Sequence, residues 1–297
     1  MTNPTEQPLA LLTAQTVVQS VALPLTDFIH RHPRLFILTG AGCSTQSGIP
    51  DYRDKNGEWK RQPPVQHRDF LTSHATRQRF WARSLIGWPL MANARPNAVH
   101  ESLQLLEQKG YCQQLVTQNV DRLHQLAGQQ QVIDLHGRSD QVICMACDRL
   151  HDRNRIHQQM ADENPEFAQY TASAAPDGDA DLDGIDFSGF KVTNCPDCDG
   201  MLKPNVVFFG DNVPKERVFS ALDSLKQSDA LLVVGSSLMV YSGFRFCKQA
   251  AQLNIPIVAI TRGKTRADEL LSLKLDGDIS EFLQPSASAL EPLATTG

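Results

Sequence analysis

A series of short apolar segments separated by helical ones is the feature that most constrains the fold of this chain. The apolar segments are Arg34–Thr39, Gln113–Thr117, Val132–Leu135, Ala230–Val234 and Ile255–Ile260. Helical segments lie between or beside them, at 215–227 and 243–253. Short buried strands that alternate with helices are typical of a parallel sheet covered on both faces. The sequence therefore predicts an α/β fold, a Rossmann-like parallel sheet with helices on both faces.

Three further helices are expected from apolar content and from stop signals. They are predicted over 9–32 with an interruption at Pro24, over 75–93, and from Pro96-Asn97 to Lys109 with Gly110 as the stop. Charges, a glycine and Pro63-Pro64 predict a loop over 52–70.

Two segments are expected to lack regular structure. The stretch 156–190 holds eight acidic residues and no Lys or Arg, which predicts an exposed loop. Within it, Asp179-x-Asp181-x-Asp183-Gly184 matches the start of a calcium-binding loop, but Phe190 stands where that loop has its bidentate Glu. The match is therefore interpreted as chance. The tail after Pro285 is small and polar and is predicted to be disordered.

Composition excludes several classes of function. The chain has 297 residues, a formal net charge of −5 and a hydrophobic content of 41%. A nucleic-acid or membrane-surface binder needs a basic face, so neither kind of partner is expected. No apolar run approaches the roughly 20 residues of a membrane span. The first 30 residues contain no Lys or Arg, so neither a secretory signal nor a mitochondrial transit peptide is recognised. A cytoplasmic location is expected, with the matrix of an organelle, after removal of a presequence, as the alternative.

The segment LTGAGCSTQSGIPDYR follows the first predicted strand and contains the turn Gly40-Ala41-Gly42. Glycines at these positions let backbone N–H groups approach a diphosphate without an intervening side chain. Thr45 stands where a dinucleotide fingerprint has its third glycine, and Pro50 excludes the long helix that normally follows. The turn predicts nucleotide chemistry of an unusual kind, with a simple tight turn as the alternative.

Polar loops follow several of the predicted strands: LTGAG, VTQNVDRLH, DLHG and VVGSS. Ligands of parallel sheets bind beyond the carboxyl ends of the strands, so these loops are expected to form one site. His136 is a candidate general base near neutral pH, and a packed or surface histidine is the alternative. Gln118, Asn119 and Asp121 offer amide and carboxylate groups suited to a ribose and a carboxamide. Cys43 has no base assigned to it by the sequence and is expected to be a packed thiol.

Two Cys-x-x-Cys pairs occupy a break in the strand–helix alternation: Cys144 with Cys147, and Cys195 with Cys198. Such pairs can place four thiolates tetrahedrally around Zn²⁺, which leaves no coordination position for water. The sequence therefore predicts one structural zinc in a small zinc-binding module, with redox-active or unliganded thiols as the alternative. The acidic surroundings argue against a nucleic-acid-binding ribbon.

Together with KPNVVFFGD and VVGSSLMVYSG, these motifs resemble those of the sirtuins, NAD-dependent protein deacylases. The resemblance runs in order over about residues 34–284, and APDGD, RFWARSLIGWP and YSGFRF look most like the class II branch. It implies an enzyme that transfers the acyl group of an acylated protein lysine to ADP-ribose. NAD would lose nicotinamide, and O-acyl-ADP-ribose would be released.

The resemblance also implies the roles of individual residues. His136 matches the catalytic base, and Asn119 is assigned a catalytic role beside it. The acylated lysine would pair as an extra strand with Val207, Phe208 and Gly210, and Phe208 would line the lysine tunnel. The implied cofactor-binding residues are Gly40, Ala41, Gly42, Ser44, Asp51, Tyr52, Arg53, Gln118, Asn119, Asp121, Gly235, Ser236, Ser237, Thr261, Arg262, Gly263 and Ile279.

The chain is expected to divide into three parts. Residues 1–54, 95–138 and 203–297 would form a discontinuous Rossmann-like NAD-binding domain. Residues 55–94 would form the cofactor loop and a helical insertion, and residues 139–202 the zinc-binding module.

Two positions depart from the family pattern. Thr261 stands where many sirtuins have Asn, and Phe80-x-x-Arg83 stands where enzymes that prefer succinyl- or malonyl-lysine have Tyr-x-x-Arg. Because the hydroxyl is missing, deacetylation is expected rather than desuccinylation. The alternatives are protein ADP-ribosylation, lipoamide or long-chain deacylation, a non-catalytic NAD sensor, and hydride transfer. The protein substrate, the preferred acyl chain and the oligomeric state stay open.

Overall fold

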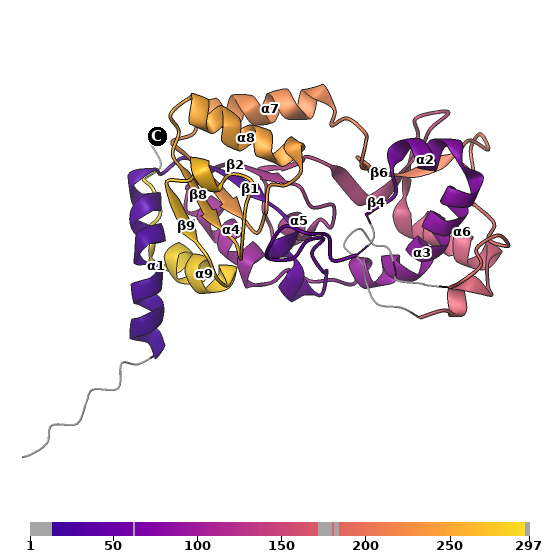
Figure 1. Cartoon of the computed structure of the whole chain (residues 1–297), viewed down its shortest axis with the longest axis horizontal. Coiled ribbons are helices and arrows are strands. Elements are labelled where there is room, and N and C mark those ends of the chain that lie inside the picture. Colours follow the sequence, from indigo (N-terminus) through magenta and orange to yellow (C-terminus); the bar gives the residue numbers. More distant parts are fainter. Residues whose placement is uncertain (1–13, 62, 172–179, 181–183, 295–297) are drawn as a thin grey trace, which may run out of the picture.

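The chain builds a larger lobe around a parallel sheet and a smaller lobe around an antiparallel one (Figure 1). The computed structural model describes residues 14–61, 63–171, 180 and 184–294. No helix in these ranges is long and apolar enough to span a bilayer.

The larger lobe contains a six-stranded sheet in the order β3-β2-β1-β7-β8-β9. All of its neighbouring strands are parallel, and Ile37 at the centre pairs with Leu115 on one side and Leu232 on the other. The predicted α/β fold is therefore confirmed. The strands are β1 (Leu35–Thr39), β2 (Cys112–Thr117), β3 (Val132–Asp134), β7 (Ala230–Val234), β8 (Ile257–Ile260) and β9 (Leu273–Leu275).

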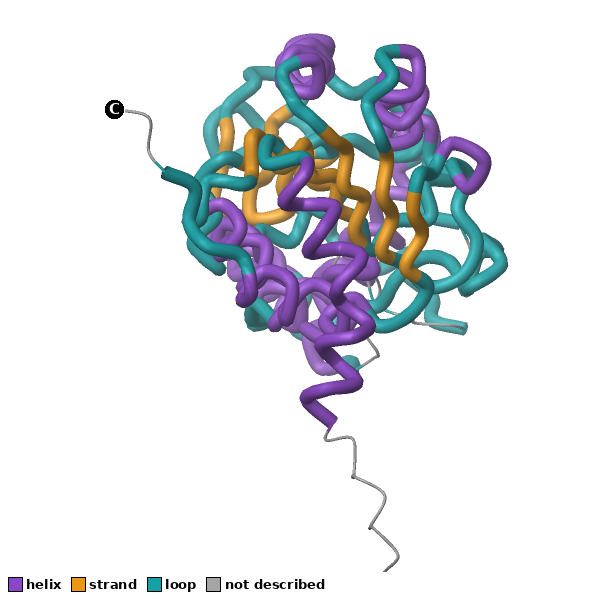
Figure 2. The backbone as a smooth tube through the Cα atoms, turned by 90° about the vertical axis from the view of Figure 1, so that its left-hand side faces the viewer, coloured by secondary structure: helices purple, strands orange, loops and turns teal. Residues whose placement is uncertain are grey.

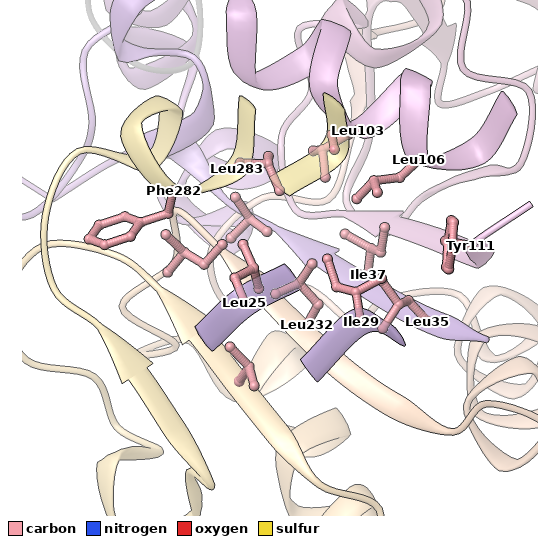
Figure 3. Close-up of a cluster of buried hydrophobic side chains, with 14 of the residues drawn as sticks. Leu25, Ile29, Leu35, Ile37, Leu103, Leu106, Tyr111, Leu232, Phe282 and Leu283 are labelled. Carbon is pink, nitrogen blue, oxygen red and sulfur yellow. The ribbon is translucent and has the colours of Figure 1, made fainter. Parts of the chain in front are cut away.

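Helices cover both faces of this sheet, as Figures 1 and 2 show. Because side chains alternate along a strand, Leu35 and Ile37 enter one core while Phe36 and Leu38 enter the other. The first core lies under α1 (Ala14–Arg31), α4 (Ala98–Gln108) and α9 (Ile279–Ala289). Figure 3 shows side chains of these three helices gathered around Ile37. The second core lies under α7 (Lys215–Lys226) and α8 (Tyr241–Gln252).

The smaller lobe has a three-stranded antiparallel sheet in the order β5-β4-β6. An aromatic core that includes Phe70, Phe80, Trp81 and Phe190 joins this sheet to the helices beside it. The elements are α2 (His67–Thr72), α3 (His74–Ala92), β4 (Gly137–Cys144), β5 (Leu150–Asp152), α6 (Arg153–Glu163) and β6 (Leu202–Val206). One turn of helix, α5 (Leu123–Leu126), follows β2 in the larger lobe.

Two predictions about proline were wrong. Helix α1 continues past Pro24 without an interruption, and Pro285 lies inside α9 rather than at the start of a disordered tail. A helix with an internal proline loses a backbone hydrogen bond, so packing must hold it together. In α9, Phe282 and Leu283 are buried, and Lys109 Nζ donates to the carbonyl of Ala287 near the end of the helix at 2.8 Å.

The prediction of an exposed loop over 156–190 was wrong for its first part. Helix α6 extends to Glu163 and buries Ile156 and Met160 against the aromatic core of the smaller lobe. Asp162 is exposed and accepts from Gln158 Nε2 at 2.9 Å, whereas Glu163 is half-buried and accepts from the buried Thr193 Oγ1 at 2.7 Å. Most of the calcium-like motif, Asp179 and 181–183, lies outside the described residues.

Candidate functional site

A cavity of 860 Å³ opens where the carboxyl ends of the parallel strands face the smaller lobe. Of the catalytic, cofactor and substrate residues predicted from the sequence, Gly263 alone is missing from its lining. The predicted residues that do line it are Gly40, Ala41, Gly42, Ser44, Asp51, Tyr52, Arg53, Gln118, Asn119, Asp121, His136, Val207, Phe208, Gly210, Gly235, Ser236, Ser237, Thr261, Arg262 and Ile279.

The glycine turn lies where the loop after β1 crosses the loop after β7. Gly40 N donates to Val234 O at 3.0 Å, and Gly42 N donates to Gly235 O at 2.9 Å. A Cβ on Gly42 would lie 2.9 Å from Gly235 Cα, and one on Gly40 would lie 2.8 Å from Ser236 Cβ. The close approach of two loops therefore requires the glycines. The N–H groups of Gly40 and Gly42 are engaged by the loop after β7, and the approach of the turn to a diphosphate stays a prediction.

His136 lines the cavity, and its two ring nitrogens have different roles: Nδ1 donates a hydrogen bond and Nε2 accepts one. Its Nδ1 is 2.9 Å from the carbonyl oxygen of Gln118, which can only accept, so Nδ1 carries the proton. Nε2 then accepts a hydrogen bond from the hydroxyl of Ser242 at 2.7 Å. Burial, assisted by the charges of Arg217 and Arg245, lowers the pKa of His136 to about 4, although its bond to Gln118 acts in the opposite direction. The imidazole is therefore neutral near pH 7.

Ser44 joins the glycine turn to the loop after β2. Its hydroxyl donates to Asp121 Oδ2 at 2.6 Å and accepts from Asn119 Nδ2 at 3.0 Å. Asp121 Oδ1 also accepts from Leu123 N at 2.9 Å. Burial raises the pKa of Asp121, and the bonds from Ser44 and Leu123 oppose that effect. The arrangement fixes the Asn119 and Asp121 side chains at one end of the cavity.

Residues 51–60 form a small turn that packs against the edge of the smaller lobe. The Arg53 guanidinium lies 3.8 Å from the centre of the Trp59 ring, and its Nη1 donates to Gly57 O at 2.7 Å. Tyr52 and Trp59 both meet Phe209 edge-on, with ring centres 6.2 and 5.6 Å apart. This segment therefore closes one wall of the cavity, where the sequence resemblance places a cofactor loop.

The loops after β8 and β9 form the adjoining part of the cavity wall. Arg262 Nη2 donates to Asp278 Oδ2 at 2.9 Å, and Gln46 Nε2 donates to Asp278 Oδ1 at 3.2 Å. Gly263 does not line the cavity. A Cβ there would lie 2.1 Å from the carbonyl oxygen of Lys55, so this glycine allows the wall to contact the 51–60 turn.

His136 is coupled to the segment predicted to bind substrate. Strand β4 begins at Gly137 and pairs with Val206 at the end of β6, and Val207 N donates to the His136 carbonyl at 2.7 Å. Gly137 has φ of 83°, and a Cβ on it would lie 2.2 Å from Asn205 O. A glycine is therefore required at this corner, which places the imidazole beside residues 207–210.

Phe208 forms an aromatic wall on the other side of that segment. Its ring centre lies 5.2 Å from those of Phe80 and Phe70. The backbone carbonyl of Phe209 accepts from His67 N at 2.8 Å, which ties the segment to α2. The apolar part of the cavity therefore lies between α3 and residues 207–210.

Four cysteines lie together at the far end of the smaller lobe. The Sγ atoms of Cys144 and Cys198 are 3.5 Å apart, and those of Cys147 and Cys195 are 3.9 Å apart. Tetrahedral ligands at a Zn–S distance of about 2.3 Å have sulfurs about 3.8 Å apart, so the cluster fits one zinc ion. His151 Nε2 lies 3.4 Å from Cys195 Sγ and supports that thiolate. The described residues therefore support one structural zinc site.

Matching tight turns present the two cysteine pairs. Asp148 N donates to the Cys144 carbonyl at 3.0 Å, and Asp199 N donates to the Cys195 carbonyl at 2.9 Å. Both aspartates have positive φ, 57° and 62°. A Cβ on Gly200 would lie 2.8 Å from Cys144 Sγ, so only glycine fits beside the cluster.

Comparison with known proteins places these features in a family. The sequence profile of the Sir2 family matches residues 40–242. A protein of Xanthomonas campestris pv. campestris (strain 8004) named "NAD-dependent protein deacetylase" is 55% identical over 91% of this chain and 92% of its own. "NAD-dependent protein deacetylase 2" of Bradyrhizobium diazoefficiens is 58% identical over 85% of this chain and 92% of its own. The chain belongs to the Sir2 family.

Solved structures agree with this membership. One described as "Sir2 bound to acetylated peptide" has a TM-score of 0.73 and 27% identity, over 90% of this chain and 97% of that chain. "Sir2-p53 peptide-NAD+" has a TM-score of 0.72 and 28% identity, over 89% of this chain and 96% of that chain. The resemblance stated from the sequence motifs is confirmed at the level of the Sir2 family; assignment to the class II branch stays a prediction.

The structure also corrects and completes the residue set of this Sir2 chain. Cys43 is the packed thiol that was predicted: it is fully buried, and burial raises its pKa to about 12. Ser242, the partner of His136, was missed, since it lies 106 residues away along the chain. Arg153 and Ser84 of the smaller lobe also line the cavity and were missed, because no local motif singles them out.

Proposed function

We propose that this Sir2-family protein is an NAD-dependent protein lysine deacylase, with deacetylation as its main activity and nicotinamide and O-acyl-ADP-ribose as products. The observation that carries the proposal is a neutral His136 whose Nε2 is a hydrogen-bond acceptor, in a cavity lined by the glycine turn and by residues 207–210. The names of relatives over 50% identical, which describe the same activity, support it.

NAD would occupy the part of the cavity formed by the larger lobe. The cofactor residues predicted from the sequence line this part, apart from Gly263, whose contribution is to seat the 51–60 turn. NAD supplies a ribose whose bond to nicotinamide breaks. Asp121, held by Ser44, is placed to accept from the carboxamide N–H₂ group, and Gln118 and Asn119 are placed to bind ribose hydroxyls.

His136 would act as the general base. Its Nδ1–H donates to Gln118 O, which fixes the tautomer and leaves Nε2 to take a proton from a ribose hydroxyl. The Ser242 hydroxyl, which now occupies Nε2, would yield this position to the ribose. A pKa of about 4 keeps the imidazole unprotonated over the physiological range. The carbonyl of Gln118 would then stabilise the positive charge that develops on the ring.

The acylated lysine would enter along residues 207–210. The hydrogen bonds from Val207 N and to Phe209 O fix this segment from within the protein. An extended peptide beside it would form backbone hydrogen bonds of the strand-addition type. The lysine side chain would then pass Phe208 toward His136. Structures of relatives described with p53 and acetylated peptides support an acyl-protein substrate.

We also propose the division of the chain predicted above, with 139–202 as the zinc-binding module and 55–94 as the cofactor loop and helical insertion. Zinc would hold β4 and the 195–200 turn together, and so would support the side of the cavity away from NAD. Cleavage by a dilute protease at sites confined to the junctions would support these boundaries.

The decisive test is nicotinamide release from NAD in the presence of an acetyl-lysine peptide, with products identified by mass spectrometry. We expect stoichiometric nicotinamide, deacetylated peptide and O-acetyl-ADP-ribose. ADP-ribose attached to protein would instead assign the site to ADP-ribosylation, and NADH would assign it to hydride transfer. Binding of NAD without nicotinamide release under any condition would leave only a sensor.

A further inference from the structure

Arg153 is a buried cation in the wall of the cavity. It opens α6, and its side chain is 2% exposed. Its Nη2 donates to Ser84 Oγ at 2.7 Å. Its guanidinium also lies 4.9 Å from the ring centre of Trp81 and 5.2 Å from that of Trp88, where the ring faces attract a cation.

The described residues give this guanidinium no anionic partner. No ion pair joins Arg153 to an acid in the described ranges, and Nη1 is buried without any hydrogen-bond partner there. Burial lowers the pKa of Arg153 to about 9. An unpaired buried charge is costly, and proteins rarely keep one without a partner or a ligand. The two N–H groups of Nη1 are therefore hydrogen-bond donors that an acceptor oxygen of a ligand could satisfy.

The position of Arg153 identifies where that oxygen would come from. Arg153 and Ser84 line the same cavity as Phe80, Phe208 and His136, on the side of the smaller lobe. Arg83, the residue that the family motif aligns with acyl recognition, does not line the cavity. Helix α3 contributes Ser84, the residue after Arg83, to the cavity lining, and α6 contributes the positive charge of Arg153.

We propose that Arg153, together with Ser84, binds the carboxylate of an acyl group that ends in one, so that carboxylate-ended acyl-lysines such as succinyl- or glutaryl-lysine are substrates of this site. The proposal rests on the proposed deacylase function and names its substrate class. In the complex, Nη1 donates to the carboxylate from one side. Ser84 Oγ accepts from Nη2, so its own hydrogen is available for the same group. A charge-assisted bond of this kind is shorter and stronger than a neutral one.

A neutral acyl group would not satisfy the same atoms. Acetyl has no oxygen beyond its carbonyl, which must lie at the reaction centre, so Nη1 would stay unpaired. A carboxamide in place of the carboxylate offers one acceptor oxygen without the charge. Leaving this charged donor without its anion costs about 1–3 kcal/mol or more, which predicts at least about tenfold in rate between a carboxylate-ended acyl group and its carboxamide. Acetyl makes no contact of this kind, so deacetylation does not depend on Arg153.

The test measures kcat/KM of the wild-type protein for three peptides that differ only in the lysine modification: acetyl, succinyl, and the carboxamide of succinyl. We expect the succinyl peptide to exceed its carboxamide by about tenfold or more. In Arg153→Met this ratio is expected to fall to near one. Arg83→Met is the matched control, and it should keep the wild-type ratio because Arg83 lies outside the cavity lining.

Two results would overturn the inference: equal wild-type rates for the succinyl peptide and its carboxamide, or loss of the ratio in Arg83→Met with retention in Arg153→Met. Faster turnover of lipoyl or long-chain acyl peptides than of succinyl would also count against it. Since Arg153→Met removes a packed side chain, Arg153→Lys is measured beside it, with zinc content and Tm. Lys keeps the charge but loses the two-nitrogen geometry, so an intermediate ratio is expected.

The failure of this inference is distinguishable from failure of the proposed function. Turnover of the acetyl peptide without a carboxylate preference rejects the role of Arg153 alone. Absence of nicotinamide release with every peptide rejects the deacylase assignment itself.

Discussion

The two lobes are stabilised by different means. The larger lobe buries aliphatic side chains on both faces of a central sheet, and all five residues of β1 and of β7 are buried. The smaller lobe has a three-stranded sheet, an aromatic core and a cysteine cluster. A short sheet with few strands gives little apolar burial, and such modules commonly depend on a metal. The comparison indicates that the cofactor half of the cavity is built by packing and the substrate half partly by zinc.

The largest expected effect comes from Cys195→Ser. Structural zinc contributes on the order of 10 kcal/mol in small zinc modules, so the smaller lobe should lose its order and catalysis should be abolished. Hydrogen-exchange mass spectrometry should show lost protection in 139–202 with retained protection in β1 and β7. Cys247→Ala, in the core of the larger lobe, is the control and should keep its zinc. Full metal content and unchanged exchange in Cys195→Ser would contradict the four-cysteine site.

His136→Ala tests the catalytic assignment without disturbing either core. Turnover of the acetyl peptide should fall by about 10²–10⁴-fold, which is the usual contribution of a general base. Zinc content should match the wild type, and NAD binding measured by calorimetry should persist. Ser242→Ala removes only the hydrogen-bond partner of His136 Nε2, so its turnover of the acetyl peptide should fall far less. A near-normal rate in His136→Ala would exclude it as the base.

Buried histidines should make the larger lobe sensitive to acid. Burial lowers the pKa values of His100 and His136 to about 4, and lowers that of His124 well below its usual value. Between pH 6.5 and 4 the unfolded chain binds protons that the folded chain does not, so folding stability is complete above the unfolded pKa and falls as pH drops. A shift of this size corresponds to roughly 3 kcal/mol per histidine.

Urea unfolding at a series of pH values checks this expectation. His100→Gln should reduce the loss of stability between neutral and acidic pH, whereas His74→Gln, at an exposed position, should leave it unchanged. A pH dependence that is the same in all three proteins would show that other groups cause it.

Gly42→Ala should have the smallest effect of these substitutions. It should change only the part of the cavity that the larger lobe forms, where NAD is proposed to bind. The added methyl would lie 2.9 Å from Gly235 Cα, which forces the two loops apart at a cost of about 1–3 kcal/mol. We expect a lower Tm and a raised KM for NAD with an unchanged KM for peptide. Gly189→Ala is the matched control, because nothing lies within 4 Å of a Cβ there. An unaffected KM for NAD in Gly42→Ala would show that the loop crossing does not position the cofactor.

The sequence predicted those features that depend on local pattern. The apolar run of β1, the start of α4 after Pro96-Asn97 and the cysteine pairs all appear where they were expected. Strand β9 and the end of α9 were missed, because contacts with distant parts of the chain hold them. Lys109 and Tyr111, for example, donate to carbonyls near the C-terminus of α9. A short LKL strand carries no signal of its own.

The candidate site likewise combines features that local sequence pattern predicted with features that depend on contacts between distant residues. His136 was recognisable because it follows a buried strand beside a glycine. The groups that set its protonation state, the Gln118 carbonyl and Ser242, come from two other loops, and no spacing in the sequence relates them. Arg153 was unrecognisable for the same reason. Its significance depends on its contact with Ser84, and on the fact that no acid pairs with it in the part of the chain that the structure describes. Both become visible only when α3 and α6 lie side by side.

The hydrogen bond between Val207 N and the His136 carbonyl has a mechanical consequence. The proton acceptor and the segment that would hold the acylated peptide extend from neighbouring ends of one pair of strands, β4 and β6, so the backbone of this pair sets the spacing between them. The ring of His136 is held separately, by Gln118 and Ser242 of the larger lobe. A change that displaced the end of β6 would therefore shift the peptide segment while the base kept its anchors, which makes the registration of the peptide depend on this one strand pair.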